Sequence, residues 1–83
     1  MSKPTSLADT PWPNIQDLID NGGNLSIGQI PPVRCAAVAA DEGNMLAALL
    51  RRDGESLIDL LDRLDEAVGK AFDEEIYTDE INS

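Results

Sequence analysis

Hydrophobic and polar residues alternate with helical spacing in the C-terminal half of the chain. Apolar residues recur every three or four positions between Leu57 and Phe72, with charged residues in between. This spacing gathers the apolar side chains on one stripe of a helix. Gly54 precedes the run, and Ser56 belongs to the residue types that cap helix N-termini. The pattern predicts an amphipathic helix over about residues 55–73, and its polar face would carry Asp59, Asp62, Arg63, Asp65, Glu66, Gly69 and Lys70.

Two apolar runs flank a turn-forming sequence upstream of this helix. They cover residues 33–40 and 45–52, and Asp41-Glu42-Gly43-Asn44 joins them. The alanine content would suit two short helices, whereas runs this short are more typical of strands. A three-residue Asp-Glu-Gly loop fits a type I turn closed by a left-handed glycine. We therefore expect a β-hairpin over about residues 33–51, with two short helices as the alternative.

The N-terminal part predicts smaller elements. Residues 13–20 have the pattern of a two-turn helix, which Asn21-Gly22-Gly23 would end. Residues 25–30 suit a short strand that Pro31-Pro32 would end. At 83 residues the chain allows one small domain. We expect an α+β fold over residues 1–83, with flexible ends at 1–10 and 74–83, and an all-α fold as the alternative.

The excess of acidic over basic residues limits the classes of partner that the protein could bind. Six Lys and Arg oppose sixteen Asp and Glu, for a net charge of -10. Phosphate backbones and anionic lipids attract clustered Lys and Arg, so we expect no direct nucleic-acid binding and no membrane binding. Residues 53–83 hold eleven acids and two bases, a net charge of -9. The concentrated negative charge favours a protein partner with a basic surface.

The chain lacks most residue types that carry catalysis. It contains no histidine, the commonest general base and metal ligand. Its single cysteine, Cys35, can form neither an internal disulfide nor a multi-cysteine zinc site. The C-terminal acids lack the Asp-x-Asp-x-Asp-Gly loop that surrounds calcium. We expect no enzymatic activity, no cofactor and no metal.

The sequence lacks the two patterns that would direct a protein out of the cytoplasm, a membrane span and a secretory signal peptide. No apolar run approaches the roughly 20 residues of a membrane span. The segment Met1-Ser2-Lys3-Pro4-Thr5 lacks the apolar stretch of a secretory signal peptide. We therefore expect a cytoplasmic protein.

Several short stretches carry a resemblance to known proteins. They are Ala39-Ala40-Asp41-Glu42-Gly43-Asn44, Gly54-Glu55-Ser56-Leu57 and the ending Tyr77-Thr78-Asp79-Glu80-Ile81-Asn82. Over about residues 36–82 the chain resembles small uncharacterised acidic proteins of bacterial plasmids and integrated mobile elements. The resemblance implies a bacterial cytosolic protein and carries no site residues.

Glu55-Ser56-Leu57, at the start of an acidic helix, is similar to the Asp-Ser-Leu motif of acyl carrier proteins. This resemblance implies that Ser56 would take a phosphopantetheine arm. Two features depart from the carrier pattern: the aspartate of the motif is Glu55 here, and only 27 residues follow Ser56. The other interpretation is that Ser56 caps the helix.

These features favour a small acidic protein-interaction module, of the accessory, adaptor or antitoxin-like kind, which could also self-associate. The alternatives are a mimic of nucleic-acid charge and, third, a carrier protein modified at Ser56. Trp12 lies between two prolines and is interpreted as a lid over the core or as a partner anchor. The candidate partner-binding residues are Trp12, Asp73, Glu74, Glu75, Tyr77, Asp79 and Glu80.

Overall fold

The computed structural model describes residues 10–30 and 33–81 and confirms the α+β class. The predicted helices and the predicted hairpin are all present, together with a fourth strand near the C-terminus. In chain order the elements are α1 (Pro13–Asp20), β1 (Asn24–Ile30), β2 (Val33–Asp41), β3 (Asn44–Leu50), α2 (Leu57–Glu74) and β4 (Thr78–Asp79).

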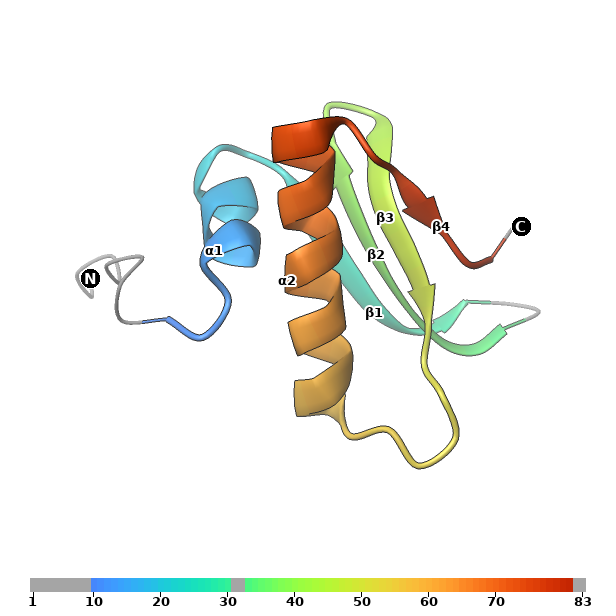
Figure 1. Cartoon of the computed structure of the whole chain (residues 1–83). Coiled ribbons are helices and arrows are strands. Elements are labelled where there is room, and N and C mark those ends of the chain that lie inside the picture. The colour runs from blue at the N-terminus through green and yellow to red at the C-terminus, as the bar shows by residue number, and fades with distance from the viewer. Residues whose placement is uncertain (1–9, 31–32, 82–83) are drawn as a thin grey trace, which may run out of the picture.

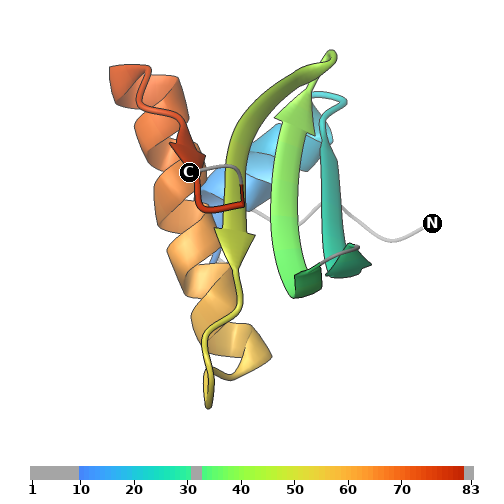
Figure 2. The same ribbon diagram turned by 90° about the vertical axis from the view of Figure 1, so that its right-hand side faces the viewer.

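The four strands form one sheet in the order β1-β2-β3-β4. The first three strands are antiparallel neighbours, and α2 carries the chain back so that β4 pairs in parallel with β3. Both helices lie on the same face of the sheet (Figure 1). Turned by 90°, the molecule shows the opposite face, which no described helix covers, although the segment that follows β4 crosses in front of β3 in this view (Figure 2). The sheet therefore has one covered face and one open face.

The core lies between the sheet and the two helices. Leu60, Leu64 and Val68 of α2 are each fully buried, as the apolar stripe predicts. The sheet meets them mainly with small side chains from the centres of β2 and β3, and α1 adds two larger ones. The buried cluster consists of Ile15, Leu18, Ala37, Ala39, Leu46, Ala47, Leu49, Leu60, Leu64, Ala67, Val68 and Ala71, with Trp12, Leu25 and Leu61 packed against it.

The turn between β2 and β3 differs from the predicted three-residue loop. Asp41 pairs with Asn44, so only Glu42 and Gly43 lie at the turn. Both have positive φ, 46° and 85°, as in a type I′ turn. This turn is favoured in hairpins because its twist matches the right-handed twist of the strands. The prediction of the hairpin is confirmed, but its turn type was wrong.

Part of the predicted flexible end is ordered. Within residues 74–83, α2 continues to Glu74 and β4 joins the sheet. The Glu80 backbone N–H donates to the Ala48 carbonyl, and the Leu50 N–H donates to a Glu80 carboxylate oxygen at 2.9 Å. These bonds anchor the segment to β3. Residues 1–9 and 82–83 lie outside the described residues, so the expectation for them stays a prediction.

The predicted polar face of α2 is not all in contact with solvent, because α1 packs against it. The buried Asp65 carboxylate accepts the backbone N–H groups of Asn14 and Ile15 at 2.8 and 2.9 Å. It replaces the local N-cap side chain that α1 lacks. Gly69 allows the close approach, since a Cβ there would lie 2.6 Å from the Asn14 side-chain nitrogen.

Candidate functional site

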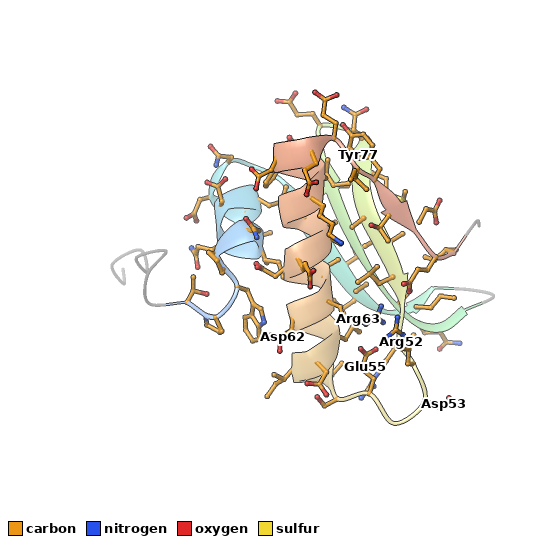
Figure 3. All side chains as sticks on the ribbon, in the orientation of Figure 1. Arg52, Asp53, Glu55, Asp62, Arg63 and Tyr77 are labelled. Carbon is orange, nitrogen blue, oxygen red and sulfur yellow. The ribbon has the colours of Figure 1, made fainter. Side chains whose placement is uncertain are left out.

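The N-terminal end of α2 holds a cluster of charges that bond to one another. The Arg63 guanidinium donates to both carboxylate oxygens of Glu55, at 2.7 and 2.9 Å, and to Glu80 at 3.2 Å. It also donates to the Leu50 carbonyl at 2.8 Å. The two side chains of the Arg63–Glu55 pair are only 22% and 9% exposed. Arg63 thus ties the end of β3, the loop before α2 and the segment after β4 to one helix (Figure 3).

This environment changes the acidity of Glu55. The hydrogen bonds from Arg63, followed by the bond from the Arg52 backbone N–H, lower the pKa of Glu55 from 4.5 to about 2. The carboxylate raises the pKa of Arg63 in return. Glu55 therefore stays ionised through the ordinary pH range, and its negative charge stabilises the contact with Arg63.

Three of the predicted partner-binding residues are involved in bonds within the chain. Trp12 is half-buried, and its indole Nε1 donates to Asp62 at 2.8 Å. Asp79 lies in β4, where its carboxylate accepts the Ile81 N–H. Glu80 belongs to the Arg63 cluster. The structure does not bring these three together with the acids at the end of α2.

The other four predicted residues gather at the opposite end of α2. Asp73 and Glu74 form the last turn of the helix, Glu75 caps it, and Tyr77 follows; all four are exposed. The β2–β3 turn lies at the same end of the molecule (Figure 1). We call this region the acidic tip: Asp41, Glu42, Asp73, Glu74 and Glu75, with the hollow that they adjoin.

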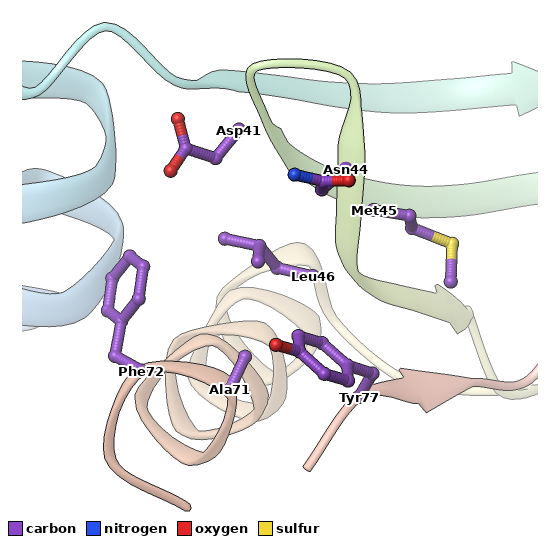
Figure 4. A pocket seen from close by; sticks show the side chains of 7 residues that line it. All are labelled: Asp41, Asn44, Met45, Leu46, Ala71, Phe72 and Tyr77. Atoms are coloured by element: carbon purple, nitrogen blue, oxygen red, sulfur yellow. The ribbon is translucent and has the colours of Figure 1, made fainter. Parts of the chain in front are cut away.

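The hollow at the acidic tip has an apolar floor. Its volume is ≈ 570 Å³, and it lies between the start of β3 and the end of α2. The rings of Phe72 and Tyr77 lie on either side of Leu46, with Asp41 beside them (Figure 4). Phe72 is 40% exposed and Tyr77 55% exposed, so both rings are available to a ligand. The hollow is lined by Asp41, Asn44, Met45, Leu46, Ala71, Phe72 and Tyr77.

The carboxylates of the acidic tip have no cationic partner within the part of the chain that the structure describes. The described ion pairs are Arg63–Glu55, Arg63–Glu80 and Lys70–Glu66. Lys70, one turn before the tip, lies 3.9 Å from Glu66. Like charges that converge without a counter-charge favour binding of a cation-bearing group.

Two glutamates of the acidic tip have backbone dihedral angles that are unfavourable for L-residues. Among the described residues, the two non-glycine positions with positive φ are Glu42 and Glu75, at 46° and 56°. An L-residue in this conformation costs about 1–2 kcal/mol. Asp73 and Glu74 also lie at the negative end of the helix dipole, with no basic residue in the last turn. Departures from local preference concentrate at functional sites.

Sequence reasoning missed the contribution of the hairpin to this site. Asp41 and Glu42 are separated from Asp73 by about thirty residues, and nothing local connects them. Phe72 was assigned only to the apolar stripe, although it lies at the end of that stripe, where coverage by the sheet stops. The signal that could have found the tip is the presence of acids in the turn and at the helix end.

Other kinds of site find no support in the described residues. No group of three or more His, Cys, Asp or Glu within residues 10–30 and 33–81 could hold a metal ion. In the same ranges, no helix combines the length and apolar character needed to cross a membrane. Ser56 caps α2, its hydroxyl accepting the Asp59 N–H at 3.0 Å. Comparison of the chain with protein-family models, curated proteins and solved structures finds no match.

Proposed function

We propose that this protein is a small non-enzymatic interaction module, acting in the cytoplasm, that binds a basic protein segment at its acidic tip. The observation that carries the proposal is the combination at one end of the molecule of exposed Phe72 and Tyr77 rings with carboxylates that lack described cationic partners. The role matches an accessory, adaptor or antitoxin-like protein.

The chemistry of the hollow defines the partner segment. An aliphatic or aromatic side chain would bury itself between Phe72 and Tyr77 over Leu46, gaining about 25 cal/mol per Å² of apolar area removed from water. Flanking Arg or Lys residues would meet Asp41, Asp73 and Glu74. Arg also stacks on aromatic faces. A segment that mixes basic and apolar residues therefore fits better than a purely basic one.

The test is a titration with a short, labelled peptide of alternating Arg and Leu, monitored by fluorescence anisotropy. The tip variant Asp73→Asn/Glu74→Gln is compared with the control Asp53→Asn/Asp59→Asn, whose residues are exposed near the other end of α2. Both pairs remove two negative charges. We expect the tip variant to raise the Kd at least tenfold and the control to change it less than about twofold. Equal weakening would show diffuse attraction and overturn the proposal.

A second pair of variants separates this function from mimicry of nucleic-acid charge. Phe72→Ala/Tyr77→Ala removes the two exposed rings on either side of Leu46, and the control Ile58→Ala removes an exposed apolar residue from the other end of α2. A charge mimic needs rows of carboxylates but no aromatic rings beside them. Loss of affinity in Phe72→Ala/Tyr77→Ala alone supports the proposed module, whereas loss only on removing charge supports the mimic.

A further inference from the structure

The open face of the sheet is apolar. The pairs Ala37–Leu49 and Ala39–Ala47 lie in the core under the helices. Successive residues of a strand point to opposite faces, so the neighbouring pairs Ala36–Leu50 and Val38–Ala48 point away from the helices. A register shift between Ala39 and Ala40 interrupts the alternation in β3 and pairs Met45 with Ala40. The described residues of β1–β3 that the register places on the open face are Asn24, Ser26, Gly28, Ala36, Val38, Ala40, Met45, Ala48 and Leu50.

This face has the composition of a buried surface. An antiparallel sheet with one solvated face normally alternates apolar and polar residues along each strand. Instead, β2 runs without a polar residue from Cys35 to Ala40, a pattern typical of strands covered on both faces. Ala36 and Ala48 are 0% and 1% exposed in the single chain, whereas Val38, Ala40, Met45 and Leu50 are partly accessible. A second layer would complete their burial.

We infer that a second copy of this chain covers the open face, forming a face-to-face dimer of sheets. The charge distribution selects this occupant. A chain with a net charge of -10 repels its own copies wherever carboxylates would oppose one another. The helices and the acidic tip present such carboxylates, whereas none of the described side chains of β1–β3 on the open face is charged, and Asp79 of β4 lies at its margin. Two copies can meet there with the least repulsion.

The shape of the face suits a two-fold contact with itself. The larger side chains of Val38, Met45 and Leu50 stand beside the small alanines Ala36 and Ala48. Ala36 and Ala48 are already buried in the single chain, so a two-fold axis would bring together the partly accessible side chains of Val38, Ala40, Met45 and Leu50. Aligned sheets pack about 10 Å apart when their side chains interdigitate. A chain of this size buries only about 60–65% of its unfolded surface, so the second layer would also stabilise it.

The dimer would leave the acidic tip free. The tip lies at one end of α2 and the β2–β3 turn, whereas the open face lies on the side of the sheet away from the helices (Figures 1 and 2). Each dimer would therefore present two tips, one per copy. The inference does not rest on the proposed function: Met45 lines the hollow as well as the open face, but the two proposals are tested at different residues.

The test measures the molar mass of the full chain by light scattering across a dilution series, with one matched pair of variants on β1. Ser26 and Ile27 are neighbours that point to opposite faces, and both are exposed, Ile27 by 42%. Ser26→Glu places a charge on the open face, and Ile27→Glu places the same charge on the helix side. We expect the unaltered chain to have twice the 8.9 kDa mass of one copy. Ser26→Glu should raise the dimer Kd at least tenfold, and Ile27→Glu should leave it unchanged.

A monomeric unaltered chain at every concentration would overturn the inference, as would a dimer that Ser26→Glu leaves intact. Equal weakening by both variants would indicate pairing through the β1 edge, which also overturns it. Val38→Glu gives a second measurement at the centre of the face, with circular dichroism used to check that the variant folds. Should that variant unfold, the β1 pair still decides.

Discussion

The two ends of α2 use the same residue types for different purposes. At the N-terminal end, Glu55 and Glu80 share one guanidinium and hold three segments together. At the C-terminal end, Asp73, Glu74 and Glu75 converge with the acids of the β2–β3 turn and have no cationic partner among the described residues. Whether a carboxylate stabilises the fold or stays available to a binding partner therefore depends on the groups that it contacts, and not on how many carboxylates lie nearby.

The two basic residues of α2 provide the sharpest test of this difference. Arg63→Met leaves Glu55 and Glu80 close together without their shared cation and should lower the free energy of unfolding by about 2 kcal/mol. Lys70→Met removes an exposed pair with Glu66 at 3.9 Å and should change it by less than about 0.5 kcal/mol. Urea unfolding at neutral pH measures both.

Arg63→Lys serves as the control for charge alone. It keeps one positive charge but loses the planar fork that bonds both oxygens of Glu55, so its stability should fall between those of the unaltered chain and Arg63→Met. Equal stability of the Arg63→Met and Lys70→Met variants would remove the distinction between the two ends of α2.

The pH dependence of stability should come from the N-terminal end. Because the pKa of Glu55 is lowered in the folded chain to about 2, its ionised form stabilises the fold at every pH above about 4.5. That contribution should disappear as the pH falls from 4.5 towards 2. Unfolding by urea at a series of pH values measures the slope. In Arg63→Met the slope over this window should be shallower, and an unchanged slope would contradict the assignment.

Replacing the strained glutamates should stabilise the protein. Glu75→Gly puts glycine at a helix C-terminal position with φ of 56°, and Glu42→Asn creates the Asn-Gly pair favoured in type I′ turns. Each should raise the free energy of unfolding by about 1 kcal/mol. At the opposite end, Gly54→Ala places a Cβ at φ of 78° with open space around it and should cost about 1 kcal/mol. A loss of stability in both glutamate variants would show that the tip is not strained.

The smallest effect concerns Ser56. Ser56→Asp keeps an oxygen that can accept the Asp59 N–H, so stability should change by less than about 0.5 kcal/mol, whereas Ser56→Ala should cost about 1 kcal/mol. Intact mass of the protein from its native host should show no phosphopantetheine arm. An addition of roughly 340 Da, the mass of that arm, would revive the carrier alternative, since the Ser56 hydroxyl would then be chemically used.

Local patterns predict the elements of this fold better than they predict its contacts. The sequence predicts α1 at its observed bounds because Pro13 and Asn21-Gly22-Gly23 mark the ends of a short amphipathic run. The hairpin and the buried stripe of α2 follow from residue spacing in the same way. By contrast, β4 has two residues and no pattern of its own, and it forms because Glu80 reaches Arg63 and Leu50.

The candidate site was only half predictable for the same reason. The acids of residues 73–75 and Tyr77 are visible in the sequence as an acidic end. The burial of Asp65, which lies outside the site, cannot be seen in the sequence. An aspartate in a polar stripe gives no sign that α1 will place two backbone N–H groups on its carboxylate. The hairpin acids join the tip only through the sheet register, which brings the β2–β3 turn to the end of α2.

The Asp65 cap has a consequence for the order in which the chain folds during synthesis. An eight-residue helix is not stable alone in water. The carboxylate that completes α1 is 51 residues further along the chain than Asn14. At about 5–20 residues per second, α1 leaves the ribosome roughly 3–10 s before its cap is made. The helix α1 therefore becomes stable only after Asp65 of α2 has been synthesised. Any nascent chain stopped before residue 65 should carry an unfolded α1.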